Sequence, residues 1–128
     1  MERQAAAFKA LGEPTRLKLA ALLAGFGEAC VCQLAEAIEE PDFKVSRHLS
    51  VLRSAGLVAS RRDGTWIHYR LTPPESPFLA SLHACLRGPV AGQAAVRTGI
   101  ARLRRSGCGP PASKAEPAPR GSARATPR

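Results

Sequence analysis

The stretch that decides the fold is "KVSRHLSVLRSAGLVASRRDGTWIHYRL", residues 44–71. Its first part places Val45, Leu49 and Leu52 at the spacing of one helix face, and Gly56 follows as a helix stop. Its second part has "DG" at 63–64 between two stretches of strand length, which predicts a β-hairpin. Residues of the second stretch alternate between two faces: Ile67, Tyr69 and Leu71 on one, and Trp66, His68 and Arg70 on the other.

Three helical segments are predicted before this stretch. Residues 3–11 form a short helix, and a second helix begins at Pro14, which suits a first helical turn, and stops at Gly27. A third helix ends at the "PDF" of 41–43, which leaves residues 44–55 as the fourth. The core-facing residues are expected to be Leu19, Leu22, Leu23 and Phe26 in the second helix and Val31, Leu34, Ala35 and Ile38 in the third, with Gln33, Glu36, Glu39 and Glu40 facing outward.

Residues 78–105 are predicted to be helical again, with a break at Gly88-Pro89, because proline cannot continue a helix. Two short helices joined by a turn and followed by a twisted hairpin make a winged helix-turn-helix. We therefore predict a mainly α fold with a β-hairpin over residues 1–105. In that fold the helix at 44–55 enters the DNA major groove, and the hairpin lies along the DNA backbone.

The charge balance favours an anionic partner. The 128 residues carry 19 Lys and Arg against 10 Asp and Glu, a net charge of +9, as expected for a protein that meets nucleic acid or a membrane surface. Residues 106–128 are rich in Pro, Gly, Ala and Ser and predict a disordered basic tail. Because the N-terminus lacks a signal-peptide core and no run approaches transmembrane length, we expect a cytoplasmic protein whose thiols stay reduced.

The helix at 44–55 has candidate DNA contacts on its outward face. With about 100° per residue, a buried stripe centred on Val45 and Leu49 leaves Arg47 and Ser50 pointing outward. Arg47 has the donors to pair with a guanine edge, whereas short polar and lysine side chains suit phosphates. The alternative is that these are ordinary solvated charges. The candidate DNA-binding residues are Lys44, Ser46, Arg47, His48 (at the edge of the buried stripe), Ser50, and Arg61 and Arg62 at the hairpin.

Two cysteines stand where the third helix begins, in "EACVCQLAEAIEE", residues 28–40. On a regular helix Cys30 and Cys32 point about 200° apart and cannot close on one ion. In an extended first turn they point the same way, so chelation would compete with helix geometry and make a usable switch. A helix N-terminus also favours the thiolate, and soft thiolates select zinc, cadmium or trivalent arsenic and antimony. The alternative is a pair of buried structural thiols.

Together these residues resemble the ArsR/SmtB family of metal- and metalloid-responsive repressors. The resemblance rests on "CVC" at 30–32, "VSRHL" at 45–49, "LRSAGL" at 52–57 and "HYRL" at 68–71, and "EACVCQLAEAI" is similar to the "ELCVCDL" signature of arsenite-sensing members. It implies a homodimer joined by its first and last helices. It also implies operator binding through Lys44, Ser46, Arg47 and His48 with the wing at 61–68 assisting, and As(III) or Sb(III) as the inducer at Cys30 and Cys32.

The sequence departs from the family pattern at Ala35, where several arsenite sensors carry a third cysteine. Trivalent arsenic prefers three sulfurs, so a third ligand would have to come from elsewhere. Cys85 lies on an apolar helical face and is expected to be a buried small hydrophobe. Cys108 lies in "SGCG", where it could reach the site, although a free tail thiol is the first expectation.

The resulting hypothesis is a repressor that binds its operator as a metal-free dimer and releases it when a metalloid binds the thiols. No organic cofactor, membrane partner or enzymatic activity is expected. Alternatives with the same fold are a repressor that responds to cadmium, lead or zinc, one that responds to thiol oxidation, and a constitutive DNA-binding protein. A thiol enzyme is disfavoured because the chain has neither a C-x-x-C pair nor a phosphate-type loop beside an activated cysteine.

Overall fold

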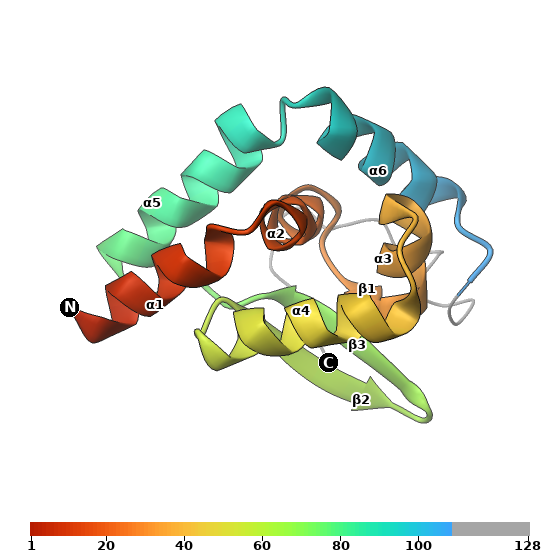
Figure 1. Ribbon diagram of the computed structural model, residues 1–128, viewed down its shortest axis with the longest axis horizontal. Helices are drawn as coiled ribbons and strands as arrows, with labels where there is room; N and C mark the ends of the chain where they lie inside the picture. The colour runs from red at the N-terminus through yellow and green to blue at the C-terminus, as the bar shows by residue number, and fades with distance from the viewer. Residues whose placement is uncertain (109–128) are drawn as a thin grey trace.

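The computed structural model describes residues 1–108 as a winged helix-turn-helix (Figure 1). Helices surround a central helix, and a three-stranded antiparallel sheet with the strand order β1-β3-β2 lies at one edge. The elements are α1 (Glu2–Leu11), α2 (Pro14–Phe26), β1 (Ala29–Cys30), α3 (Val31–Ile38), α4 (Asp42–Ser54), β2 (Val58–Asp63), β3 (Trp66–Leu71), α5 (Pro77–Cys85), the π-helical turn η1 (Leu86–Val90) and α6 (Ala94–Arg105). The predicted fold class is confirmed.

Local sequence signals place the helix ends as predicted. The Glu13 carboxylate accepts a hydrogen bond from Arg16 N at 2.9 Å, and Pro14 is the first residue of α2. Gly27 ends α2 with φ 114°, a value that glycine tolerates at no steric cost. The predicted break near Gly88-Pro89 is confirmed, because η1 separates α5 from α6 there.

The recognition helix α4 begins two residues earlier than predicted. Residues 39–41 separate α3 from α4, Pro41 has extended backbone at the N-cap position, and Asp42 already lies in the first turn. An acidic residue in that turn is favourable beside the positive end of the helix dipole. The predicted core stripe is confirmed: Val45, Leu49 and Leu52 are fully buried.

The hairpin has the two expected strands, and a third strand, β1, which the sequence did not indicate, pairs with it. Asp63 pairs with Trp66, so the loop has two residues and begins at Gly64, whose φ of 65° suits a type II′ turn. On its other side β3 pairs with β1, with Cys30 opposite His68. His68, which shares a face with Trp66 and Arg70 in the predicted alternation, is 1% exposed at this pairing.

The helix α2 is the centre of the core, and α6 packs closely against it. A Cβ added at Gly99 of α6 would lie 2.7 Å from Leu22 Cδ2, and one added at Gly25 of α2 would lie 2.7 Å from Ile100 Cδ1. Small residues at these positions let the two helices approach. As a result α6 runs beside α3 as well as α2 (Figure 1), and Arg102 near its end contacts Ala37 and Glu39 at the end of α3.

The predicted tail falls mostly outside the described residues, which end at Cys108. Ser106 is nevertheless buried, so the ordered part of the chain continues past the predicted boundary at 105. Within residues 1–108 no helix has the length and apolarity needed to cross a bilayer.

The buried His83 in α5 predicts a pH dependence of stability. Burial lowers its pKa and Arg87 lowers it further, while a hydrogen bond to the backbone of Thr72 raises it less. The unfolded chain takes up a proton at about pH 6.5 that the folded chain resists. The stability that neutral His83 contributes is therefore fully present above about pH 6.5. It is lost as the pH falls toward the lower pKa that His83 has in the folded chain.

Urea denaturation at a fixed protein concentration measures this effect. We expect a smaller free energy of unfolding at about pH 5.5 than at about pH 7.5, and we expect His83→Gln to reduce the difference. Burial also lowers the pKa of His68, so His83→Gln keeps part of the dependence of unfolding free energy on pH. An identical pH dependence in wild type and His83→Gln would contradict the assignment.

Candidate metalloid site and nucleic-acid interface

The two thiols of the "CVC" segment lie together at the start of α3. Cys30 is the N-cap residue with extended backbone, φ −91° and ψ 169°, and Cys32 lies in the first turn. Their sulfurs are 3.5 Å apart. For metal–sulfur bonds of about 2.3 Å, two sulfurs on one tetrahedral ion lie about 3.8 Å apart, so this spacing suits a chelate. Neither arrangement predicted from the sequence is present in full: Cys30 precedes the helix with extended backbone, whereas Cys32 lies in α3, which is helical from Val31 onward.

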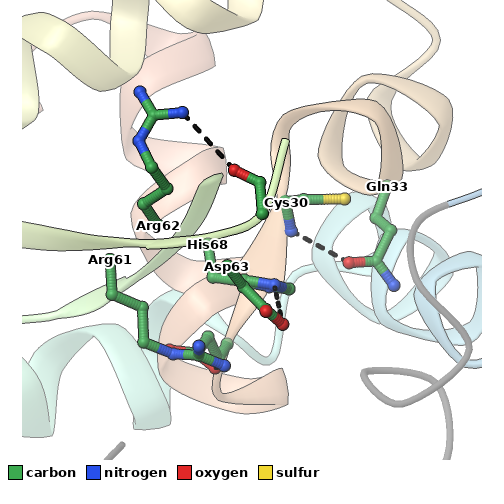
Figure 2. A network of polar contacts seen from close by, with 8 residues as sticks. Cys30, Gln33, Arg61, Arg62, Asp63 and His68 are labelled. Atoms are coloured by element: carbon green, nitrogen blue, oxygen red, sulfur yellow. Dashed lines mark hydrogen bonds and ion pairs between the residues drawn. The ribbon is translucent and has the colours of Figure 1, made fainter. Parts of the chain in front are cut away.

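Gln33 holds this helix start in place. Its side-chain oxygen accepts a hydrogen bond from Cys30 N at 2.9 Å, and the Cys30 thiol faces the backbone N–H of Gln33 in return, an arrangement like a capping box (Figure 2). The prediction that Gln33 faces outward is wrong: it is fully buried because it caps the helix from inside. Its Nε2 has no hydrogen-bond partner among residues 1–108.

The environment of Cys30 differs from the expectation of a thiolate stabilised by the helix N-terminus. Cys30 is 2% exposed, and this burial raises the pKa of its thiol, which outweighs the lowering by backbone N–H groups of Gln33, Cys32 and Cys30 itself. Cys32 is less buried. The free protein therefore favours the neutral thiol at Cys30, and an ion that binds there must displace a proton.

The other two cysteines do not lie where the sequence indicated. Cys108 forms a disulfide with Cys32, so the prediction of a free tail thiol is wrong. Cys85 is exposed rather than buried, because the buried face of the segment is centred on His83 and Leu86. In this disulfide-bonded state, residues 1–108 hold no group of three or more His, Cys, Asp or Glu side chains placed for a metal ion.

A network of polar contacts connects the thiol segment to the wing, which is the β2–β3 hairpin. Arg61 of β2 donates two hydrogen bonds to the Glu28 carboxylate, at 3.0 and 2.8 Å, and Glu28 directly precedes β1. Figure 2 shows Arg61, Asp63 and His68 grouped beside Cys30. The 3.8 Å contact from His68 to the exposed Asp63 is too long for a hydrogen bond, so burial still lowers the pKa of His68.

The Arg61–Glu28 pair predicts a measurable coupling energy. The pair is bidentate and about 30% exposed, so we expect about 1 kcal/mol in a double-mutant cycle of Arg61→Ala and Glu28→Ala, near the upper end for surface pairs. Because salt screens partly exposed charges, the coupling should decrease in about 1 M NaCl. Urea denaturation of the four proteins measures it, and strictly additive losses would contradict a stabilising pair.

The outward face of α4 presents most of the predicted DNA contacts together. Lys44, Ser46, Arg47 and Ser50 are exposed. The Arg47 guanidinium stacks 5.9 Å from the centre of the Phe43 ring, and Lys44 makes an exposed 3.7 Å contact with Glu40. Both side chains can therefore leave these contacts at small cost when a phosphate or base is present.

His48 and two residues of α2 form one side of a depression beside α4. As predicted, His48 is half-buried, and its Nδ1 lies 3.4 Å from Arg16 Nη1. Thr15 and Arg16 line the depression together with Lys44, Arg47 and His48. Arg16 was not among the DNA-binding residues predicted from the sequence. The available signal was its place in the first turn of α2, directly after the Glu13 cap.

The hairpin arginines separate into two kinds. Arg62 is exposed near the tip of the wing, within 3.5 Å of the Gly64 carbonyl oxygen. Arg61 is engaged by Glu28, so its charge is already neutralised within the chain. Among residues 1–108, Arg62 has no acidic partner, whereas Arg61 is held by Glu28.

Comparison with known proteins identifies the domain. Residues 13–60 match the family model described as "Bacterial regulatory protein, arsR family". The arsenical resistance operon repressor of Escherichia coli K12 is 48% identical over 66 residues, which cover 52% of this chain and 56% of that protein. The chain thus spans little more than half the length of this relative.

Two further matches cover a larger share of the protein to which this chain is similar. The arsenical resistance operon repressor of Bacillus subtilis 168 is 38% identical over 78 residues, covering 61% of this chain and 74% of the relative. The solved homodimeric winged helix-turn-helix DNA-binding domain of Mb0332 from Mycobacterium bovis, described as a possible ArsR-family regulator, has a TM-score of 0.58 and 34% identity, covering 70% of this chain and 79% of that domain. The chain therefore belongs to the ArsR family of bacterial regulatory proteins.

Proposed function

We propose that this protein is a transcriptional repressor that binds operator DNA as a homodimer and releases it when trivalent arsenic or antimony binds Cys30 and Cys32. The observation that carries the proposal is the 3.5 Å separation of the two sulfurs at a helix start that contacts both DNA-binding elements. Cys30 pairs with β3 of the wing, and α3 packs against α4. The arsenical-resistance relatives support the choice of inducer.

On the DNA side, α4 supplies the readout and the wing supplies a backbone contact. Arg47 pairs with a base edge, while Lys44, Ser46 and Ser50 contact phosphates or mixed groups, and His48 assists from the edge of the helix. Arg62 contacts phosphate from the wing. Arg61 acts differently from the first expectation: it ties the wing to Glu28 rather than binding DNA.

Dimerisation would use α1 and α5, the first part of the predicted last helix, because α6, its second part, packs against α2 and α3. Phe8 of α1 is 59% exposed although it packs against Phe78 of α5, with ring centres 5.5 Å apart. Phe78 is partly buried, so Phe8 is the exposed member of the pair, and an exposed aromatic side chain beside a second one is typical of an interaction surface. The homodimeric neighbour from M. bovis supports a homodimer. A single species of twice the chain mass in sedimentation equilibrium is the expected result.

The inducer signal would pass from the thiols in two directions. A ligand on both sulfurs moves Cys30, which moves its strand partner His68 in the wing, and moves Cys32, which lies in the helix that packs on α4. A useful switch needs a coupling of about 1–3 kcal/mol between inducer and DNA. By linkage, operator DNA must weaken inducer binding by the same factor.

Fluorescence anisotropy on DNA from the protein's own promoter tests the proposal. Protein fully reduced with a phosphine is titrated with arsenite, antimonite, cadmium and zinc. Release by arsenite or antimonite at lower concentrations than the cations supports the metalloid reading, and release by cadmium or zinc alone would replace it with cation sensing. DNA that stays bound in every titration would overturn inducible repression.

A second candidate is repression relieved by thiol oxidation, which the Cys32–Cys108 disulfide favours. In that case hydrogen peroxide would take two electrons from the two thiols, forming the disulfide and two molecules of water. Peroxide would then release DNA from reduced protein, and a reductant would restore binding. Unchanged binding after complete oxidation would exclude this candidate.

A further inference from the structure

Three of the four cysteines converge at the start of α3, although only two are close in the sequence. Cys30 and Cys32 have sulfurs 3.5 Å apart, and Cys108 is bonded to Cys32 from a position 76 residues away. The fourth, Cys85, ends α5, which lies on the opposite side of α2 from α3 (Figure 1). Cys108 is therefore the cysteine that the fold delivers to the pair.

Contacts other than the disulfide also bring Cys108 to this place. Arg102 of α6 donates to the Ala37 carbonyl oxygen of α3 at 3.0 Å and pairs with Glu39 at 3.4 Å. Ser106, 5% exposed, donates to the Glu36 carboxylate at 2.6 Å and accepts from Cys108 N at 3.2 Å. These bonds join residues 106–108 to α3 independently of the disulfide.

We propose that reduced Cys108 is the third sulfur ligand of the inducer site, which makes the site selective for inorganic arsenite over monomethylarsenite. The inference rests on the proposed function. Arsenous acid has three hydroxyl groups, and three thiols replace them: three As–S bonds form, three As–O bonds break, and each thiol proton leaves with a hydroxide as water. Monomethylarsenite has two exchangeable hydroxyls, because its third bond is to carbon.

The difference in valence makes the role of Cys108 measurable. Inorganic arsenite gains a third As–S bond from Cys108, whereas monomethylarsenite is already satisfied by Cys30 and Cys32. Cys108 thereby compensates for Ala35, which is buried in α3 and has no sulfur to offer. In the disulfide form Cys32 and Cys108 are both blocked, so binding requires the reduced protein.

The test compares Cys108→Ser with wild type in direct binding of sodium arsenite and monomethylarsenite, followed by ultraviolet As–S absorbance without DNA and with a phosphine as the reductant. We expect Cys108→Ser to weaken arsenite binding at least about tenfold and to change monomethylarsenite binding less than about twofold. X-ray absorption should count three sulfurs around arsenic in wild type and two in the variant. Cys85→Ser is the matched control and should bind both compounds like wild type.

The possible failures are distinguishable. Equal arsenite affinity and three sulfurs in both wild type and Cys108→Ser would overturn the third ligand, as would parallel losses for both arsenicals. If Cys30→Ser and Cys32→Ser still abolish binding in that case, the proposed function stands. If those two variants bind arsenite like wild type, the proposed inducer site itself is wrong. Circular dichroism and DNA binding of metal-free Cys108→Ser check that the variant is folded.

Discussion

Cys30→Ser and Cys32→Ser should each abolish release of operator DNA by arsenite while leaving the DNA affinity of the metal-free protein within about twofold of wild type. Each substitution removes one half of the 3.5 Å sulfur pair, and a hydroxyl is a poor ligand for a soft ion. If the coupling is about 1–3 kcal/mol, its loss removes a 5–150-fold effect of arsenite on DNA affinity. Anisotropy titrations of reduced protein with and without arsenite measure it.

The control for this prediction is Cys85→Ser, which changes an exposed thiol on α5 and should respond to arsenite like wild type. Because Cys30 is buried, thermal melting must show that its serine variant is folded at the assay temperature. Retention of the arsenite response by either CVC variant would contradict the two-thiol site.

Much of the fold was predictable because local signals agreed with the global pattern. The apolar spacing of Val45, Leu49 and Leu52 located the recognition helix, and the hairpin followed from its two-residue loop and alternating strands. The helix break at Gly88-Pro89 followed from proline chemistry. The thiol pair was also predictable, because the helical and extended backbone periods each determine whether the side chains of Cys30 and Cys32 point apart or to the same side.

Most of the unpredicted features depend on contacts between distant parts of the chain, whereas the Gln33 cap is local. Strand β1 has two residues, too few to show a period, and exists because β3 pairs with it. Gln33 appears polar and outward until the Cys30 N–H that it caps is known. Arg61 carries a charge that Glu28 neutralises from 33 residues away, and Cys108 reaches Cys32 because α6 is held on α3. Periodicity contains none of this information.

Arg47→Ala should weaken binding to the cognate operator about 10–100-fold and reduce the preference for it over unrelated DNA. The reason is that a bidentate contact to a guanine edge is worth about 1–3 kcal/mol and carries sequence information. Lys44→Ala should instead weaken binding to both DNAs alike and lower the salt slope by about 1, because one phosphate contact is lost. Affinities on both DNAs at several salt concentrations separate the two effects.

The matched control is Arg53→Ala, which removes an arginine from the same helix. Its guanidinium donates to Ser60 Oγ of β2 at 3.2 Å and is directed to the wing rather than to the face shared by Lys44 and Arg47. Loss of net charge alone would make Arg53→Ala and Arg47→Ala equivalent, with equal losses on cognate and unrelated DNA. A loss confined to cognate DNA and to Arg47→Ala would instead require that this side chain reads a base, which also fixes the face of α4 that enters the groove.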